Sequence, residues 1–224
     1  MPPTVLNALG INRAFYAAHA QEYCRKTAEP RRNESCGPFV AMLSHGAKIL
    51  DAGCGSGRDS LALARRGFRV TAIDASPEMA REARSRGVDA RVMAFQELEF
   101  VSEFDGIWAC ASLLHVPRAE MPGVLGGFHR ALRPQGALYV SLKEGMGERV
   151  AEDGRFFSYF TLAEFGEMLE HANFRVVKAW QSFDREFSGA ERSWVNFLAT
   201  RSASEVSVDD RGVKTHAGGD PRFP

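Results

Sequence analysis

Residues 49–59 read ILDAGCGSGRD, an apolar segment that passes through three alternating glycines into the start of a helix. Glycine permits a tight backbone turn and lets a ligand lie directly on the chain. Asp74 follows about 20 residues after Gly53, where a carboxylate can accept hydrogen bonds from both ribose hydroxyls of a nucleoside. Because parallel sheets bind ligands outside the carboxyl ends of their strands, the stretch predicts a nucleoside site at two adjacent strand ends.

The spacing of the glycines also indicates which nucleoside is bound. A dinucleotide fingerprint has the pattern GxGxxG, which would need a glycine where this chain has Arg58. Asp51 and Asp59 place negative charge near the position of a pyrophosphate, which disfavours a doubly charged anion. The same charges suit a ligand with a cationic amino-acid end. We therefore predict S-adenosylmethionine, which carries a sulfonium and an ammonium, rather than a nicotinamide dinucleotide.

The segments around this stretch alternate between apolar strands and helices. The predicted strands are 48–51, 68–73, 89–93, 104–110 and 137–142, and the predicted helices between them are 58–66, 77–86 and 118–132. Ser76 followed by Pro77 is typical of a helix start. Helices between successive strands imply crossover connections, and therefore a parallel sheet with helices on both faces.

The pattern changes after the fifth strand. Residues 143–159 read as a polar loop, and Thr161 with Glu164 forms a capping box that opens a helix. Two further strands, 174–180 and 193–199, have no helix between them, so we expect them to pair antiparallel at the sheet edge.

The two ends of the chain also differ from the centre. The N-terminal part reads as a helix over 12–27 and a short apolar helix over 39–44, separated by a Pro- and Arg-rich break. Residues 201–224 are polar and lack periodicity, so we predict a disordered tail.

Several segments resemble the class I S-adenosylmethionine-dependent methyltransferases, in particular small bacterial UbiE-like and tellurite-resistance-like members. The segments LDAGCGSG at 50–57 and IDASPEM at 73–79 look like the family's first motif and the acidic strand end after it. FDGIWACASLLHVP at 104–117 is similar to the fourth strand and its loop, and LRPQGAL at 132–138 to the turn into the fifth strand.

The resemblance covers about residues 12–200 and implies a fold and a cofactor. The fold is α/β, with a doubly wound, mostly parallel seven-stranded sheet of order 3-2-1-4-5-7-6 whose last strand is antiparallel. It implies a single domain over 1–200, composed of an N-terminal helical lid at 12–44 and a core at 46–200. The implied cofactor is S-adenosyl-L-methionine, with S-adenosyl-L-homocysteine as product.

Carried over to the matching positions, the resemblance implies a set of cofactor contacts. The glycine loop would hold the methionine portion, Asp74 the ribose, and Ala75 and Met79 one side of the adenine. Phe95 and Gln96 would flank the other side, where many members have an aspartate that this chain lacks. The predicted set is Tyr16, Asp51, Gly53, Cys54, Gly55, Gly57, Arg58, Asp74, Ala75, Met79, Phe95, Gln96, Cys110 and Ala111.

Methyl transfer mainly requires that the acceptor be aligned, because the cofactor carries its own leaving group. His115 follows the fourth strand and could act as a base at neutral pH; the alternative is that it caps a helix or packs against the lid. Lys143 and Arg155 could contact the acceptor. The alternatives are that Lys143 is a solvated charge at a strand end and that Arg155 belongs to a segment that anchors the lid. The predicted catalytic set is His115, Lys143 and Arg155. No metal site is predicted, because no Cys or His pair has zinc-ligand spacing.

The composition limits the class of protein. The chain has 224 residues, 45% of them apolar and 25% charged, as in soluble globular domains. Lys and Arg total 28, and so do Asp and Glu, so no net charge attracts nucleic acid or anionic membrane. No apolar run reaches the ~20 residues of a membrane span, the N-terminus does not read as a signal peptide, and four cysteines do not form a disulfide framework. We expect a cytoplasmic protein.

These features favour a methyltransferase that acts on a small molecule, without nucleic acid or membrane as partner. The alternatives are a tRNA or protein methyltransferase of the same fold, a non-catalytic S-adenosylmethionine-binding protein, and an oxidoreductase that binds a nicotinamide or flavin. A group of arginines on outward positions could contact RNA, but acidic residues elsewhere and the lack of an added RNA-binding module favour a solvated face: Arg65, Arg66, Arg69, Arg81, Arg84 and Arg86. No motif identifies the acceptor or the oligomeric state.

Overall fold

Seven strands form one sheet in the computed structural model, which describes residues 5–27, 36–185 and 191–202. They are β1 (Lys48–Ala52), β2 (Arg69–Asp74), β3 (Ala90–Val92), β4 (Phe104–Cys110), β5 (Leu132–Lys143), β8 (Phe174–Arg185) and β9 (Glu191–Arg201). Their order is β3-β2-β1-β4-β5-β9-β8; the first five pair in parallel, and β9 pairs antiparallel with both β5 and β8. Counted within this sheet, the order is 3-2-1-4-5-7-6 with the last strand antiparallel. The predicted doubly wound α/β fold is confirmed.

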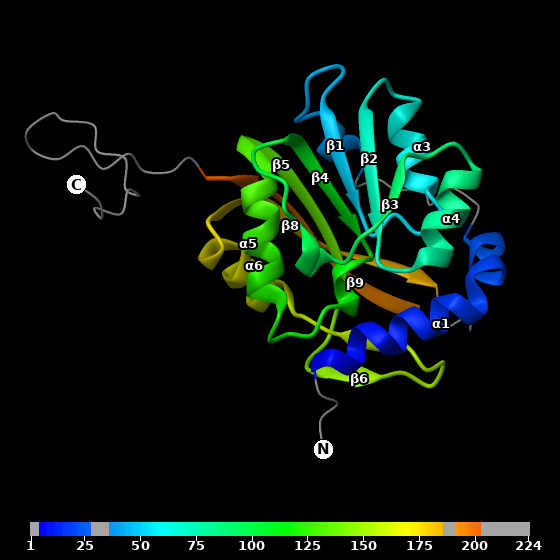
Figure 1. Ribbon diagram of the computed structural model, residues 1–224. Helices are drawn as coiled ribbons and strands as arrows, with labels where there is room; N and C mark the ends of the chain where they lie inside the picture. Colours follow the sequence, from blue (N-terminus) through cyan, green and yellow to red (C-terminus); the bar gives the residue numbers. More distant parts are fainter. Residues whose placement is uncertain (1–4, 28–35, 186–190, 203–224) are drawn as a thin grey trace, which may run out of the picture.

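Helices cover both faces of the sheet (Figure 1). They are α1 (Val5–Lys26), α2 (Cys36–Val40), α3 (Arg58–Ala64), α4 (Pro77–Ser85), α5 (Met121–Ala131) and α6 (Leu162–His171). Leu50 and Ile107 belong to the core beneath α5 and α6, whereas their neighbours Ile49 and Trp108 belong to the opposite core beneath α2 and α3. Successive residues of a strand point to opposite faces, so these central strands are apolar on both sides. The helix predicted over 39–44 forms slightly earlier, as α2.

The connection from β2 to α4 has the predicted helix cap. Ser76 Oγ accepts a hydrogen bond from the backbone nitrogen of Met79 at 3.2 Å, and Pro77 stands in the first turn. A cap of this kind stabilises a helix by ~1 kcal/mol. The backbone nitrogen of Ser76 also donates to Asp74 Oδ1 at 2.8 Å. The cap therefore fixes the carboxylate at the end of β2.

A helix and a hairpin lie beside the carboxyl ends of the parallel strands (Figure 1). The helix is α1, which begins before the predicted range 12–27. The prediction of a loop over 143–159 is wrong: it contains the antiparallel pair β6 (Glu148–Val150) and β7 (Phe156–Ser158). All of β6 is exposed and all of β7 is buried. Neither strand has the alternation of apolar and polar residues that marks a strand in a sequence.

The edge strands are longer than their sequence patterns predict. The strands expected at 174–180 and 193–199 extend to β8 and β9, because each pairs with the other along almost its whole length. Arg201, assigned to the tail, is the last residue of β9, and Ser202 donates its backbone N–H to Asn173. The rest of the predicted tail, 203–224, lies outside the described residues.

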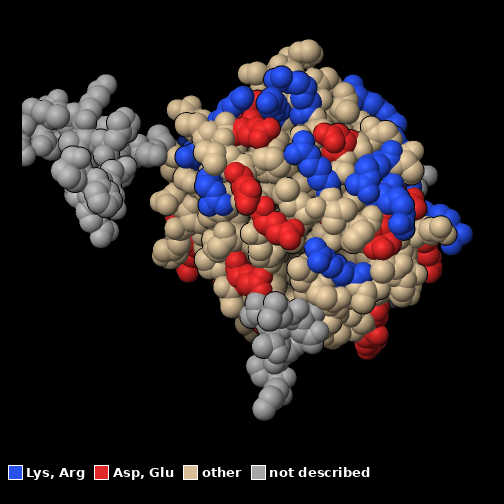
Figure 2. Space-filling view, in the orientation of Figure 1, with Lys and Arg blue, Asp and Glu red and all other residues tan. Residues whose placement is uncertain are grey.

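Charged side chains of both signs are interspersed on the face shown in Figure 2. All six arginines of the predicted basic group are exposed. Arg66 donates to Cys36, Arg69 to the carbonyl of Gly46 and Arg84 to the carbonyl of Ala90, so half of the group already has partners in the protein. None of the described helices is both long and apolar enough to cross a membrane.

Candidate functional site

A cavity opens at the carboxyl ends of β1, β2 and β4, and α1 forms its opposite wall. Most of the residues predicted to bind the cofactor line it: Tyr16, Asp51, Gly53, Cys54, Gly55, Arg58, Asp74, Ala75, Met79, Phe95, Gln96, Cys110 and Ala111. The candidate base His115 lines it as well. Three predicted residues, Gly57, Lys143 and Arg155, lie outside this lining. The fold thus brings residues from five separate segments to one place.

The glycine loop turns so tightly that only glycine fits its first position. Gly53 has φ +83° and Gly55 φ +53°, a region that residues with a side chain enter only with strain. A Cβ on Gly53 would lie 2.4 Å from Cβ of Ser112. The backbone nitrogens of Gly53 and Cys54 both donate to the carbonyl of Ile73 at 2.9 Å, which ties the loop to β2.

Asp74 is fixed from two directions. Its Oδ2 accepts from the backbone nitrogen of Gly55 at 2.8 Å, and its Oδ1 accepts from that of Ser76 at 2.8 Å. Burial raises the pKa of this carboxyl, and the two backbone hydrogen bonds oppose that rise. Each oxygen keeps a lone pair for another donor. The geometry suits a ligand that offers two hydroxyl groups.

Asp51 is a buried carboxyl in a negative environment. It is 3% exposed and accepts from Ser60 Oγ at 2.5 Å. Burial, with the neighbouring charge of Asp59, raises its pKa from 3.8 to about 7. A cationic group in the cavity would favour its charged form.

Arg58 has partners in the protein already. Its Nε donates to Asp59 at 2.8 Å and its Nη1 to the carbonyl of Thr27 at 3.2 Å, so it joins the start of α3 to the end of α1. The side chain lines the cavity as part of the connection between helix and core.

Gly57 faces away from the cavity. A Cβ there would lie 2.7 Å from Cγ2 of Val88, and φ is +77°. The third glycine therefore allows α3 to pack closely on the connection between α4 and β3, and its place in the cofactor set stays a prediction.

Phe95 and Gln96 begin a single 3-10 turn, η1 (Phe95–Glu97), after β3. The side-chain nitrogen of Gln96 donates to Glu120, so the amide has a partner on the α5 side. Phe95 packs edge-on against Phe128 with ring centroids 5.8 Å apart, and Met79 is 1% exposed beneath Gly55. These positions give the cavity an apolar wall.

The thiols of the site are poor nucleophiles. Burial raises the pKa of Cys54 far above its usual range, and nearby Asp51 and Asp74 raise it further. Cys110 lies within 3.6 Å of Ser141 Oγ, which donates to it. All four cysteines of the chain are free thiols.

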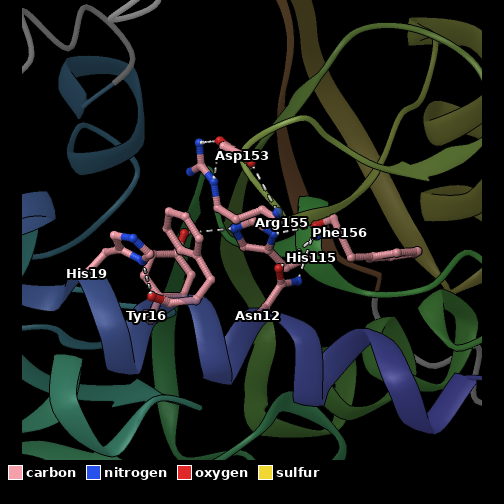
Figure 3. Close-up of polar contacts among 8 residues, drawn as sticks. Asn12, Tyr16, His19, His115, Asp153, Arg155 and Phe156 are labelled. Atoms are coloured by element: carbon pink, nitrogen blue, oxygen red, sulfur yellow. Dashed lines mark hydrogen bonds and ion pairs between the residues drawn. The ribbon is translucent and has the colours of Figure 1, made fainter.

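His115 lies at the end of a 3-10 turn, η2 (Leu113–His115), between α1 and β7 (Figure 3). Its Nδ1 is 2.9 Å from the carbonyl oxygen of Phe156, and its Nε2 is 3.0 Å from the hydroxyl oxygen of Tyr16. Burial lowers the pKa of His115 to about 4, with smaller contributions from Arg155 and Lys143. Burial also raises the pKa of Tyr16. Both side chains are therefore neutral at pH 7.

Lys143 and Arg155 lie behind His115 rather than on the cavity wall. Both cations face the ring of Phe157, Lys143 Nζ at 3.7 Å and Arg155 Cζ at 4.9 Å from its centroid. Arg155 also forms an ion pair with Asp153. Lys143 is buried, so the alternative that it is a solvated charge is wrong. Their positive charges keep the neighbouring imidazole neutral.

The sequence analysis missed several polar residues of the cavity, among them Asn12, Arg13 and Ser112. Asn12 is buried and hydrogen-bonded to the backbone of Phe156. Arg13 donates to the carbonyl of Ala75 at 2.8 Å. Ser112 is 7% exposed, and its Oγ has no hydrogen-bond partner among the described residues. The only local signal was the position of Ser112 just after β4, because the contacts of Asn12 and Arg13 join distant segments.

Comparison with known proteins agrees with this geometry. Residues 49–136 match the family model described as a methyltransferase domain. The ubiquinone biosynthesis O-methyltransferase of Xylella fastidiosa is 41% identical over 104 residues, which is 43% of this chain and 42% of that protein. The match thus spans about two fifths of the length of the curated relatives.

Two solved structures share the fold over most of the chain. The 1,6-didemethyltoxoflavin-N1-methyltransferase of Burkholderia thailandensis, solved with 1,6-didemethyltoxoflavin and S-adenosylhomocysteine, has a TM-score of 0.73 at 24% identity and covers 91% of this chain and 92% of its own. A TehB-like methyltransferase of Corynebacterium glutamicum has a TM-score of 0.64 at 23% identity and covers 83% and 100%. The chain therefore shares its fold with these methyltransferases, and its residues 49–136 match the methyltransferase domain model.

Proposed function

We propose that this chain is an S-adenosylmethionine-dependent methyltransferase that acts on a small-molecule acceptor in the cytoplasm. The observation that carries the proposal is the Asp74 carboxylate, which Gly55 and Ser76 hold at the cavity wall beside a loop whose first turn only glycine fits. The curated relative named above is an O-methyltransferase, which supports the reaction class. Four free thiols support a reducing compartment.

The residues of the cavity fit this cofactor. Ribose hydroxyls can donate to Asp74, and the carboxylate of Asp51 suits an ammonium group. Met79 and Phe95 offer apolar surface to an adenine ring. The hydroxyl of Ser112, buried without a protein partner, offers one further polar contact. Gly53, Cys54, Gly55, Arg58, Ala75, Gln96, Cys110, Ala111 and Tyr16 complete the proposed cofactor surface.

The bound cofactor supplies a methyl group on a sulfonium, whose sulfur leaves as an uncharged thioether. His115 is neutral near pH 7, and its Nε2 can take the proton of an attacking acceptor O–H or N–H that replaces the Tyr16 hydroxyl as its donor. A positioned base of this kind contributes about 10²–10⁴-fold to the rate. Lys143 and Arg155 affect His115 through their charges, which disfavour the imidazolium and so help to keep the ring unprotonated before the acceptor binds. α1 lines the cavity on the side opposite the strand ends.

A small acceptor with a weakly acidic O–H or N–H group suits this site best. The base lies inside the cavity, beneath α1, and it is flanked by the hydroxyl of Tyr16 and the ring of Phe157, 5.0 Å from the imidazole. A nucleotide within folded RNA would have to leave its base stack to reach this position, whereas a free planar metabolite would not.

Calorimetric titration with S-adenosylhomocysteine and with NADH tests the cofactor. The wild type should bind S-adenosylhomocysteine, and Asp74→Ala should lose roughly 100-fold in affinity, because hydrogen bonds to a charged group contribute about 1.5–3 kcal/mol each. Asp89→Ala, at an exposed position just before β3 and away from the cavity lining, is the control and should bind normally. Binding of NADH alone, or normal affinity of Asp74→Ala, would contradict the proposal.

Transfer of labelled methyl groups tests the acceptor. A panel of phenols and nitrogen heterocycles is compared with bulk tRNA and with bulk protein under the same conditions. Incorporation into the small molecules supports the proposal. Incorporation into tRNA or protein only, or cofactor binding without transfer to any acceptor, would overturn it.

A further inference from the structure

Asn12 joins α1 to the hairpin through two hydrogen bonds to a single residue. The backbone nitrogen of Phe156 donates to Asn12 Oδ1 at 2.9 Å, and Asn12 Nδ2 donates to the Phe156 carbonyl at 3.2 Å. Asn12 is 5% exposed and 144 residues away from Phe156 in the chain. Both partners of this contact are therefore held in place beneath the surface (Figure 3).

The same carbonyl oxygen determines the tautomer of His115. It lies 2.9 Å from His115 Nδ1, and a carbonyl only accepts hydrogen bonds, so Nδ1 carries the proton. In the neutral imidazole, Nε2 then has the free lone pair. That lone pair faces the Tyr16 hydroxyl at 3.0 Å, which donates to it. The proton-accepting atom is thus directed at the wall of the cavity formed by α1.

We propose that Asn12 is a positioning residue, which holds the Phe156 carbonyl against His115 Nδ1 and so directs the Nε2 lone pair into the cavity. Asn12 and Tyr16 both lie on α1, one turn apart. Docking of α1 and alignment of the base are therefore one event, and the base is correctly oriented only when the cavity is covered. The catalytic consequence rests on the proposed function, whereas the tautomer does not.

Nitrogen-15 NMR of the histidine side chains in the full-length protein tests the structural part without cofactor or acceptor. His115→Asn identifies the His115 signals among the six histidines of the chain. In the wild type, Nδ1 of His115 should be protonated and Nε2 unprotonated. Asn12→Ala, and the isosteric Asn12→Asp, which cannot donate to the carbonyl, should convert this single tautomer into a mixture.

Arg13→Ala distinguishes orientation of the base from docking of the helix in general. Arg13 ties the same helix to the Ala75 carbonyl and does not contact the Phe156 carbonyl. This variant should keep the single tautomer of His115. If it produces the same mixture as Asn12→Ala, or if both Asn12 variants keep the wild-type tautomer, the inference is wrong whatever the cofactor proves to be.

Kinetics with an acceptor from the panel test the catalytic part. Asn12→Ala should lower kcat about 10–100-fold and change the affinity for S-adenosylhomocysteine less than about 3-fold. Asn12→Ala in a His115→Asn background should cost nothing further, because the two residues act as one unit. His19→Ala, exposed on the same helix, is the control with normal activity. Additive losses would mean that Asn12 does not act through His115.

Discussion

The two sides of the cavity are built in different ways. We compare a glycine-loop side, which consists of Asp51, Gly53, Gly55 and Asp74, with an α1 side, which consists of Asn12, Tyr16, His115 and Phe156. On the glycine-loop side, Gly55 and Asp74 are joined by a backbone donor across 19 residues of chain. On the α1 side, side chains join Tyr16 to His115 across 99 residues and Asn12 to Phe156 across 144.

The difference shows how one fold can serve many acceptors. A loop formed by backbone geometry and one carboxylate depends on few side chains, so few substitutions can alter it. A wall assembled from side chains of distant segments changes with every substitution in α1 or the hairpin. The cofactor is therefore a property of the fold, and the acceptor a property of this chain.

The largest effect should follow from Gly53→Ala. The left-handed backbone costs about 1–2 kcal/mol for a residue with a side chain, and the overlap with Ser112 adds typically 1–3 kcal/mol. We expect a loss of about 2–5 kcal/mol in the free energy of unfolding, measured by urea denaturation, and a loss of S-adenosylhomocysteine binding.

The matched control is Gly123→Ala in α5, where no atom lies within 4 Å of the added Cβ. It should be neutral or slightly stabilising, because alanine favours the helix by ~1 kcal/mol. Equal destabilisation at the two positions would mean that the glycine loop is no more constrained than an ordinary helix surface.

Asp51 should make the glycine-loop side less stable as the pH rises. Its pKa is raised to about 7 from 3.8. The contribution of the protonated carboxyl to the free energy of unfolding is therefore fully present below pH 3.8 and is lost as the pH rises through 7. The two pKa values correspond to roughly 4 kcal/mol. The wild type should therefore lose up to that amount relative to Asp51→Asn between pH 4 and pH 8, measured by urea denaturation. If the free energies of unfolding of the wild type and Asp51→Asn changed in parallel with pH, the pKa of Asp51 would not be raised by burial.

His115 should give the α1 side the opposite pH dependence. Its pKa is lowered to about 4 from 6.5. The contribution of the neutral imidazole to the free energy of unfolding is therefore present above pH 6.5 and is lost as the pH falls through 4. The wild type should gain up to roughly 3 kcal/mol over His115→Asn between pH 4 and pH 7. If the wild type instead lost stability relative to His115→Asn as the pH rises, as is expected for Asp51, the comparison between the two sides would fail.

The smallest effect should come from Gln96→Ala. The side-chain nitrogen of Gln96 already donates to Glu120, which is partly exposed. The affinity for S-adenosylhomocysteine, measured by calorimetry, should change less than about 3-fold, equivalent to ~0.6 kcal/mol. A loss above 10-fold would mean that the amide leaves Glu120 to contact the adenine.

The sheet could be predicted because its signals are local. The segment 104–110 is an apolar run bounded by polar residues, and it forms β4 over the same bounds. The hairpin β6–β7 could not be predicted, because β7 is buried beneath α1 and η2 rather than within a regular layer. Its buried Ser158 looks like a loop residue, yet its hydroxyl donates to the Val116 carbonyl at 2.7 Å.

The candidate site, like the fold, was predictable only where its residues are set by local sequence spacing. Asp74 and Gly53 follow from spacing along the chain, and both line the cavity. Lys143 and Arg155 were placed on the acceptor side by their positions after β5, but both cations face the ring of Phe157 and neither lines the cavity. No sequence pattern states which side chain a cation will face across the fold.

The sequence by itself determined the order of strands and helices, the glycine turn and the carboxylate after β2, because each depends on interactions within about 20 residues of chain. Only the tertiary structure decided which atom of His115 faces the cavity and which residue directs it. Those features arise where α1, η2 and β7 meet, and a contact across 144 residues leaves no periodicity or spacing by which it can be found.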